Sequence, residues 1–430
     1  MKVTSGWRVY FLGALLLLGL TTSARNFGDR GGAYFMASLT LAGIAYLLAL
    51  REFFATPRFA RSIVVAGLIL AGVGHLEFLR AAPGADDDIH RYVWDGRLQR
   101  LGYNPYLVVP SDPAVQAMHT AETRNLNNPD LPSPYPAGAQ LFFRAVTAMH
   151  ESVFALKVAF VVCELVIVFV LLDLLRSTGH GEHLVLAYAW NPLLAVEVAG
   201  SGHIDIVGAL LLVLSAAALA RRWRATAAVA FGVAVAVKFL PIVLMPLYWK
   251  RVRIRDGVLA TGVVALLYVP FLDHGRISTG SLGTYVRSFR FNGPVFAVLD
   301  RVAPRQLLSA LAVLAGILVA MWIRRKSGGL SSEAFAWPMA ASLLFAPVVF
   351  PWYLLWLVPF LTSASTLLIT VWTMSIIPVY VMWHLRAQGR PWGALPVWVM
   401  LLEYGALAIV AAVLGFRRLG RRSVPQFSTD

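Results

Sequence analysis

The sequence predicts an all-α fold, a polytopic integral membrane helix bundle with about 12 full spans and one short broken hairpin. Of its 430 residues, 58% are hydrophobic and 14% are charged, which lies far outside the composition of a soluble globular domain. Apolar runs long enough to cross a bilayer recur along the whole chain. Because we find no convincing repeat and no appended soluble segment, residues 1–430 are expected to form a single transmembrane domain.

The predicted spans are apolar runs separated by charged or glycine-containing linkers. They cover residues 7–22, 33–50, 63–78, 153–175, 184–199, 204–220, 258–272, 307–323, 334–350, 352–361, 367–385 and 395–416. We interpret the first run as an uncleaved span, because no clear small-residue cleavage site follows it. The broken hairpin is segment 225–249, which bends at Lys238-Phe239-Leu240-Pro241 and has arms too short to cross fully.

The basic residues indicate how the chain is oriented in the membrane. The formal net charge is +15, but many of the lysines and arginines form short clusters between apolar runs, as at 221–224 and 250–255. Such clusters are typical of cytoplasmic loops. We therefore expect both termini in the cytoplasm and no nucleic-acid partner. The single cysteine, Cys163, lies inside an apolar run and excludes a disulfide framework.

This orientation places a loop of about seventy residues, 80–152, outside the membrane, which is longer than a simple connection requires. The loop begins with Asp86-Asp87-Asp88, and adjacent carboxylates repel one another, so at least one is expected to have a raised pKa. A carboxylate with a raised pKa suits general-base chemistry near neutral pH. The alternative interpretation is a solvated acidic turn. Residues 140–149 are predicted to form an interfacial helix, and a second outer loop covers 273–305.

Aromatic and basic residues gather around the acidic run. Arg91, Tyr92, Trp94 and Tyr106 offer stacking faces for a sugar and a cation for a phosphate, although an interfacial aromatic belt would have the same composition. Lys238, in the broken hairpin, is costly in hydrocarbon unless it reaches the surface or meets an anion such as a lipid phosphate.

The segment 197–205 brings a glutamate, a histidine and an aspartate to the level of the acidic loop. Its small residues Gly200, Ser201 and Gly202 would let backbone amides approach an anion, and a plain polar turn is the alternative. Asp86 to Asp88 could hold a hard divalent cation through oxygen ligands. No metal-ligand spacing is convincing, however, so we expect no metal site and no cofactor.

Several of these stretches resemble one family. The runs from Asp87 to Gly96 and from Gly102 to Tyr106 look like the first outer loop of polytopic, C-type glycosyltransferases that use polyprenyl-phosphate sugars. The likeness is closest to bacterial polyprenol-phosphate-mannose-dependent mannosyltransferases. It continues through these further stretches: 127–136 with Gln140, 191–203, 237–241 and 351–353. His90 departs from the pattern, because relatives often have a second aromatic residue there.

The resemblance implies transfer of a hexose, with mannose the first choice, from a polyprenyl-phosphate donor to a glycan or lipid-linked acceptor, with inversion, at the outer face of the bacterial plasma membrane. Asp88, which keeps an Asp-Ile-x-x-Tyr spacing, is the expected general base, and Asp87 a second catalytic carboxylate. The expected donor-phosphate ligands are Lys238, Arg91 and His203. The expected substrate-binding residues are Tyr92, Trp94, Asn104, Tyr106, Tyr135, Gln140, Asp205, Arg287, Trp352 and Tyr353.

Two other functions share these features. A transporter or flippase of lipid-linked sugars would also use broken helices, but its ionisable groups should lie deep within several spans. Here they cluster at one face beside a long loop, which favours an enzyme. A glycan ligase or polymerase would share the lipid-phosphate leaving group and remains the second alternative.

Overall fold

Long apolar helices dominate the computed structural model, which describes residues 6–84, 87–124, 126–326, 331–391, 393 and 395–422. Within these residues, eight helical segments are long and apolar enough to cross a membrane. They are α1 (Trp7–Arg25), α2 (Ala33–Ala55), α3 (Arg61–Arg80), α6 (Val153–Ser177), α12 (Ile254–Tyr268) with the turn after it, α15 (Arg305–Lys326), the composite Ala364–Ala387 and α19 (Val397–Arg422). The all-α polytopic fold is confirmed, and the number of spans stays a prediction.

The remaining elements are shorter. In the first part of the chain they are η1 (Phe27–Asp29), α4 (Asp88–Arg100), η2 (Pro113–Met118), α5 (Ala137–Met149), η3 (Glu182–Leu184), α7 (Val185–Ala189), α8 (Pro192–Leu194), the π-helix η4 (Ala195–Gly200), α9 (Asp205–Ala220), α10 (Arg224–Val237), η5 (Leu240–Leu244) and α11 (Met245–Tyr248). Later ones are η6 (Val269–Phe271), β1 (Leu272–Asp273), β2 (Arg276–Ile277), α13 (Leu282–Ser288), α14 (Pro294–Leu299), α16 (Ser332–Phe345), η7 (Pro351–Trp356), η8 (Val358–Phe360), η9 (Ala364–Thr366), α17 (Leu367–Ser375), η10 (Ile377–Tyr380) and α18 (Val381–Ala387).

Two of the predicted spans are not continuous helices. Segment 184–199 breaks at Pro192, which has no N–H to continue α7, and Asn191 caps the next turn by accepting a hydrogen bond from the Leu193 N–H at 3.1 Å. Segment 352–361 forms the 3₁₀ turns η7 and η8, each of which contains a proline near its start. Both segments are buried inside the bundle, where protein shields their irregular backbone.

The predicted break in segment 225–249 is confirmed. Helix α10 ends at Val237, Lys238 follows in an extended conformation, and η5 and α11 return toward the other end. The physical reason is Pro241, whose ring would clash with the carbonyl of Val237 if α10 continued. Helices α9 and α10 form a hairpin, so Asp205 at the start of α9 and Lys238 at the end of α10 lie side by side.

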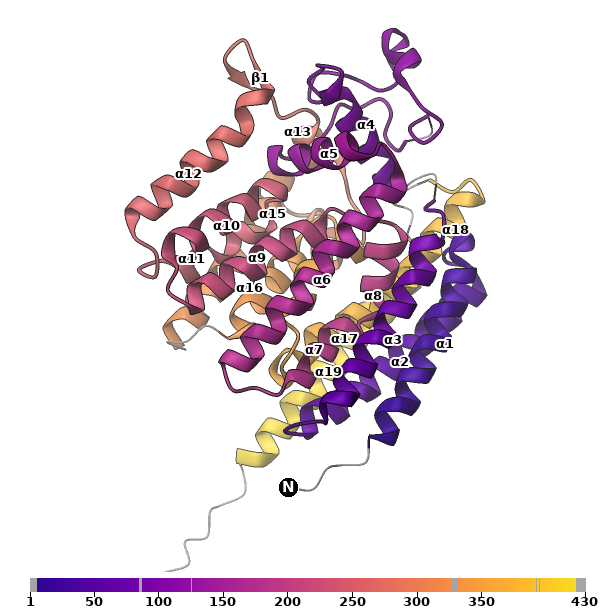
Figure 1. Cartoon of the computed structure of the whole chain (residues 1–430), viewed down its shortest axis with the longest axis vertical. Helices are drawn as coiled ribbons and strands as arrows, with labels where there is room; N and C mark the ends of the chain where they lie inside the picture. Colours follow the sequence, from indigo (N-terminus) through magenta and orange to yellow (C-terminus); the bar gives the residue numbers. More distant parts are fainter. Residues whose placement is uncertain are drawn as a thin grey trace, which may run out of the picture.

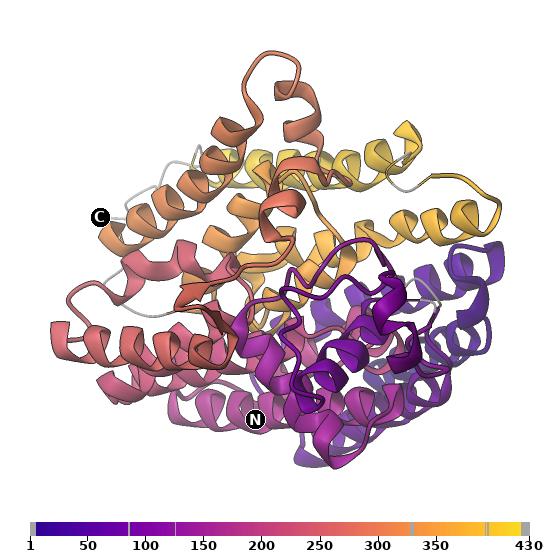
Figure 2. The same ribbon diagram turned by 90° about the horizontal axis from the view of Figure 1, so that it is seen from above.

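The two long loops lie at the same end of the molecule, which we call the loop end. Figure 1 shows α4, α5, β1 and α13 together there, and Figure 2 looks down on them. The first loop runs between the end of α3 and the start of α6, as predicted. The helix expected at 140–149 is α5, which starts three residues earlier, and its interfacial position stays a prediction. Helix α4 crosses α5 closely: a Cβ on Gly96 would meet the Phe143 carbonyl oxygen at 2.7 Å.

Close approach and polar contacts hold the first helices together. A Cβ on Gly19 of α1 would meet the Ser38 carbonyl oxygen of α2 at 2.7 Å, so the two backbones are nearly in contact. Beside it, the hydroxyl oxygens of Ser23 and Ser38 lie 2.8 Å apart in a hydrogen bond. In a lipid bilayer the hydrophobic effect does not drive helices together, so they associate through close packing at small residues and through hydrogen bonds between helices.

Candidate active site

Asp88 is the first residue of α4, where the helix dipole favours a negative charge. Its Oδ1 accepts a hydrogen bond from the Asn127 amide at 2.6 Å, and its Oδ2 lies 3.9 Å from Nδ1 of His203. The side chain remains 20% exposed. Asp88 is therefore oriented by two neighbours and still accessible to a substrate.

Asp87 has a different environment. One carboxylate oxygen accepts a hydrogen bond from Arg30 at 2.8 Å and the other accepts one from the Gly84 N–H at 2.7 Å, and both charged groups are buried. Arg30 also donates to the Ser201 hydroxyl at 2.7 Å. The ion pair offsets the repulsion expected between Asp87 and Asp88 and leaves Asp87 no free face for a substrate. Asp86 lies outside the described residues.

Arg30, which lies between α1 and α2 at the loop end, was not among the predicted site residues. One signal was available: Arg30, like Arg25, lies between two predicted spans, on the face where the positive-inside rule does not place basic residues. Membrane orientation therefore does not explain an arginine at this position, which indicates a structural or functional role. In the structure its guanidinium also lies 4.7 Å from the Phe27 ring centroid and 5.3 Å from that of Trp383.

His203 is buried between two carboxylates. Its Nε2 lies 3.0 Å from Glu197 Oε2, and Glu197 in turn accepts a hydrogen bond from the Tyr380 hydroxyl. Burial opposes a charge on the ring, but the hydrogen bond and charge of Glu197, with help from Asp88 and Asp87, raise the pKa of His203 above its usual value. Because both nitrogens face carboxylates, this placement gives no support to the predicted phosphate role of His203.

The aromatic ring of Trp352 holds His203 in place. It stacks on the imidazole with centroids 4.0 Å apart and on Phe350 from the other side at 4.3 Å. The turn η7 thus presents Trp352 and, next to it, Tyr353 to the segment that carries His203. This stack joins η7, in the second half of the chain, to the segment that carries His203.

Lys238 and Asp205 form the other half of the site. The Lys238 ammonium donates to Asp205 Oδ1 at 2.7 Å and lies 3.8 Å from the Tyr353 ring centroid. The same Asp205 oxygen accepts a hydrogen bond from the Trp356 indole N–H at 2.7 Å. Asp205 Oδ2 has no hydrogen-bond partner among the described residues. Asp205 is buried, whereas the Lys238 side chain is 24% exposed.

Two tyrosine hydroxyls belong to the same region. The Tyr285 and Tyr353 hydroxyl oxygens are 2.7 Å apart. Burial, together with the negative charges of Asp88 and Asp205, raises the pKa of Tyr285, so both carboxylates lie near this hydroxyl. Burial and the charge of Asp88 likewise raise the pKa of Tyr135 well above its usual value. These phenols stay protonated at neutral pH and can donate hydrogen bonds. Tyr285 was not among the predicted site residues.

Several predicted site residues hold the loop together instead of facing this site. Arg91 donates to Asp95 at 3.0 Å and to the Leu131 carbonyl at 2.8 Å, and Gln140 donates to the same Asp95 at 2.8 Å. Burial raises the pKa of Asp95 in spite of these partners, of which Arg91 is the strongest. All three side chains are buried, so Arg91 has no free face for the phosphate that was predicted to bind there.

The aromatic and amide residues of the loop are likewise engaged. The Tyr92 ring stacks on Phe143 with centroids 4.3 Å apart, and Trp94 stacks on His119 at 4.0 Å. Asn104 donates to the Phe271 carbonyl at 3.0 Å, and the Tyr106 hydroxyl donates to the Tyr135 carbonyl at 2.7 Å. These contacts fold the loop and attach it to Phe271, at the end of η6. Arg287 lies exposed on α13.

The charged cluster, by which we mean Arg30, Asp87, Asp88, Glu197, His203, Asp205 and Lys238, divides by exposure. Within this cluster, five groups are buried and paired, while the Asp88 carboxylate and the Lys238 ammonium remain partly open. A carboxylate can take a proton, and an ammonium can stabilise a growing negative charge. Across the described residues, no group of three or more His, Cys, Asp or Glu side chains is arranged to hold a metal ion.

Comparison with known proteins gives one match. The family model described as alpha-(1->6)-mannopyranosyltransferase, N-terminal domain, matches residues 14–252, which is more than half of the chain. Searches of curated proteins and of solved structures find no match. The matched region contains the whole charged cluster, whereas Tyr285, Trp352, Tyr353 and Trp356 lie beyond it.

Proposed function

Because the chain belongs to the alpha-(1->6)-mannopyranosyltransferase family and is therefore a membrane glycosyltransferase, we propose that it transfers mannose from a polyprenyl-phosphate donor at its loop end. One observation carries the proposal: of the charged cluster, the two partly open groups are a carboxylate and an ammonium. These are the two groups that an inverting transfer from a phosphate leaving group requires, one on each side of the anomeric carbon.

Asp88 is the general base of the proposed reaction. The acceptor hydroxyl gives its proton to the Asp88 carboxylate as its oxygen forms a bond to the anomeric carbon, and the bond from that carbon to the phosphate oxygen breaks. Asn127 and His203 hold the carboxylate in one orientation. Asp87 acts at a distance, by securing the start of α4 through its ion pair with Arg30.

Lys238 receives the departing polyprenyl phosphate. Two of its three N–H donors remain available after the hydrogen bond to Asp205, and its side chain is the more exposed partner of that pair. The neutral hydroxyls of Tyr285 and Tyr353 lie beside it as further donors to phosphate oxygens or sugar hydroxyls. The unpartnered Oδ2 of Asp205 provides an acceptor for a hydroxyl of the donor sugar.

The positions of the basic clusters support a reaction at the outer face of the membrane. The loop end lies one crossing away from the basic clusters at 221–224 and 250–255, which the positive-inside rule assigns to the cytoplasm. We therefore place the site outside, in the plasma membrane, with both termini inside. A lipid-linked donor fits this side of the membrane. No metal ion enters the proposed step, because both Asp87 oxygens are already occupied by Arg30 and Gly84.

A transporter or flippase, and a ligase or polymerase, remain the competing functions. A flippase needs no base, so an oriented and open Asp88 would have no role in it. A polymerase would use a lipid-linked glycan as the donor. Supplying polyprenyl-phosphate mannose beside polyprenyl-phosphate glucose, and following the transfer of labelled sugar, separates these activities.

The test replaces the base. Asp88→Asn keeps the size and the Asn127 contact but cannot take a proton, so labelled mannose transfer in membranes should fall at least a thousandfold while the protein accumulates normally. Asp130→Asn, an exposed carboxylate of the same loop, is the matched control and should transfer at the normal rate. Running the assay with a chelator should leave the rate of the unmodified chain unchanged. Undiminished transfer by Asp88→Asn would refute the base assignment.

A further inference from the structure

The α9–α10 hairpin carries a second charged site at the end opposite the loop end. Helix α9 begins at Asp205 and has 16 residues, so it extends about 24 Å at 1.5 Å per residue. The loop that joins it to α10 therefore lies about one helix length from the charged cluster. Helix α12 also begins at this end, because its other end reaches the first loop through the Asn104 contact to Phe271.

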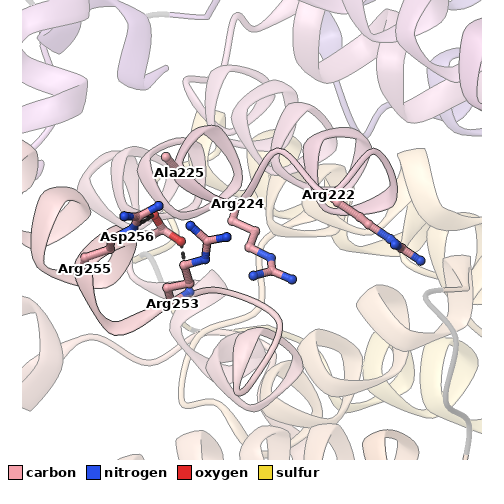
Figure 3. A pocket seen from close by; sticks show the side chains of 6 residues that line it. All are labelled: Arg222, Arg224, Ala225, Arg253, Arg255 and Asp256. Carbon is pink, nitrogen blue, oxygen red and sulfur yellow. Dashed lines mark hydrogen bonds and ion pairs between the residues drawn. The ribbon is translucent and has the colours of Figure 1, made fainter.

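A cavity of about 400 Å³ lies between these two helix starts. It is lined by Arg222, Arg224, Ala225, Arg253, Arg255 and Asp256. The lining has a formal excess of three positive charges. In Figure 3, Arg224, Arg253, Arg255 and Asp256 lie close together, whereas Arg222 extends away from them.

The one carboxylate of the lining is committed to its own helix. Asp256 Oδ2 accepts a hydrogen bond from the Arg253 backbone N–H at 3.0 Å, and Oδ1 lies 3.8 Å from Nε of Arg255. In the described part of the chain, the guanidinium groups of Arg224 and Arg253 form no ion pair with a carboxylate. Like charges that converge from two separate loops repel one another unless an anion lies between them.

The helix geometry adds to the positive potential. Arg224 is the first residue of α10 and Arg253 is the residue before α12, helices of 14 and 15 residues. Both helices thus direct free backbone N–H groups and the positive ends of their dipoles toward this end. A cluster that served only to orient the chain in the membrane would not need arginines from two loops around one cavity. Arginine binds phosphate oxygens with paired N–H groups.

We propose that this arginine cavity binds the phosphate headgroup of an anionic membrane lipid. The surroundings favour a lipid over a soluble phosphate. Trp223, between two of the arginines, is 60% exposed, and Ile254 and Val258 on the outer face of α12 are 90% and 66% exposed. A headgroup held by the arginines would leave its acyl chains along this apolar face of α12, which lies among the candidate membrane spans.

The test compares lipids and variants on the purified full-length chain in neutral detergent. Phosphatidylglycerol, phosphatidylcholine and inorganic phosphate are added in parallel, and binding is measured by native mass spectrometry and by the shift in Tm. Phosphatidylglycerol should bind and raise the Tm, whereas phosphatidylcholine and inorganic phosphate should not. An equal Tm shift with inorganic phosphate would overturn the lipid proposal in favour of a soluble anion.

The variant Arg224→Gln/Arg253→Gln should bind phosphatidylglycerol at least tenfold more weakly. The control Arg58→Gln/Arg61→Gln removes the same charge from another loop at this end and should bind normally. If the double variant does not fold, the single variant Arg253→Gln serves and should weaken binding severalfold. An equal loss of phosphatidylglycerol binding in the control would show that only the total positive charge at this end matters, which would overturn the proposal. Unchanged binding in both variants would also overturn it. Mannose transfer by the double variant should persist, so this result is independent of the proposed activity.

Discussion

Neighbouring residues in the acidic run differ because of where α4 begins. Asp87 precedes the helix and turns inward, where Arg30 neutralises it, while Asp88 occupies the first helical turn and stays partly open. The same contrast separates Asp205 from Lys238. They share one hydrogen bond, but the Asp205 side chain is buried and the Lys238 side chain is partly exposed. At this scale, burial decides which charged group binds a neighbour and which is left for a substrate.

The protonation of His203 gives a prediction about pH. Its pKa is raised in the folded protein, which favours the protonated ring, and the ring loses its proton as the pH rises through the folded pKa. Loss of the charge removes the attraction of the ring to Glu197 and Asp88. The contribution of this attraction to folding stability is fully present below the unfolded pKa of about 6.5 and is lost as the pH rises through the folded pKa. Mannose transfer should therefore decline on the alkaline side.

His203→Gln, with no titrating ring, should transfer mannose about tenfold more slowly, a loss of ~1.4 kcal/mol in transition-state stabilisation. It should also lack the alkaline decline. The measurement is kcat/KM against pH for the unmodified chain and the variant. An identical alkaline limb in both would show that another group titrates.

The irregular elements bring the site together. A straight helix through 184–199 would place Glu197 on a regular helical face, whereas the break at Asn191-Pro192 and the π-helix η4 place it against His203 and Tyr380. The break after α10 likewise leaves Lys238 at the tip of a hairpin. Broken helices are where membrane proteins commonly build binding sites, because unwound backbone and helix ends gather polar groups there.

The contact between α9 and η7 predicts the effect of a small substitution. A Cβ on Gly208 would lie 1.9 Å from the Trp356 ring, so Gly208→Ala must displace that indole at a cost of about 1–3 kcal/mol. Trp356 would lose its hydrogen bond to Asp205, and Lys238 would lose its fixed partner. We expect about tenfold slower mannose transfer and a lower Tm. Gly262→Ala on α12, where a Cβ meets nothing within 4 Å, is the control and should retain both.

At the scale of the whole molecule, Arg30 connects three distant parts of the chain. It joins the loop between α1 and α2 to Asp87 at the start of α4 and to Ser201 after the π-helix, which is 171 residues away. Residues beyond the family match then complete the site: Trp352 stacks on His203, and Tyr353 lies against Lys238. The charged cluster therefore depends on both halves of the chain for its arrangement.

Removal of this connection should destabilise the fold. Arg30→Gln leaves the Asp87 carboxylate buried without its cation, which costs about 3–5 kcal/mol when a buried pair is broken on one side. We expect a clearly lower Tm in detergent and little mannose transfer. Arg30→Gln/Asp87→Asn removes both charges and should recover much of the Tm. A double variant no more stable than Arg30→Gln would contradict this account.

Local patterns predicted most of the architecture. The spans that became α1, α2, α3 and α6, the loop between residues 80 and 152, the interfacial helix and the break at Lys238 were all visible in hydropathy, charge and proline positions. The predicted span at 184–199 was wrong as a continuous helix, because an apolar run indicates burial in the membrane but not whether the backbone is regular. Arg91 and Gln140 were placed in the site because polar residues near an acidic run cannot be sorted by sequence into those that fold the loop and those that face the substrate.

The sequence by itself determined that this chain is a helical membrane protein with an acidic loop at one face, because hydropathy, charge and proline act over short stretches of chain. The resemblance to mannosyltransferases, which the family match bears out, was also legible in its motifs. Only the tertiary structure decided that Asp87 is paired, that Asp88 and Lys238 are partly open, and that the Tyr285 hydroxyl meets that of Tyr353. Those properties are exposure and pairing, and they arise from residues that meet only when distant segments pack together.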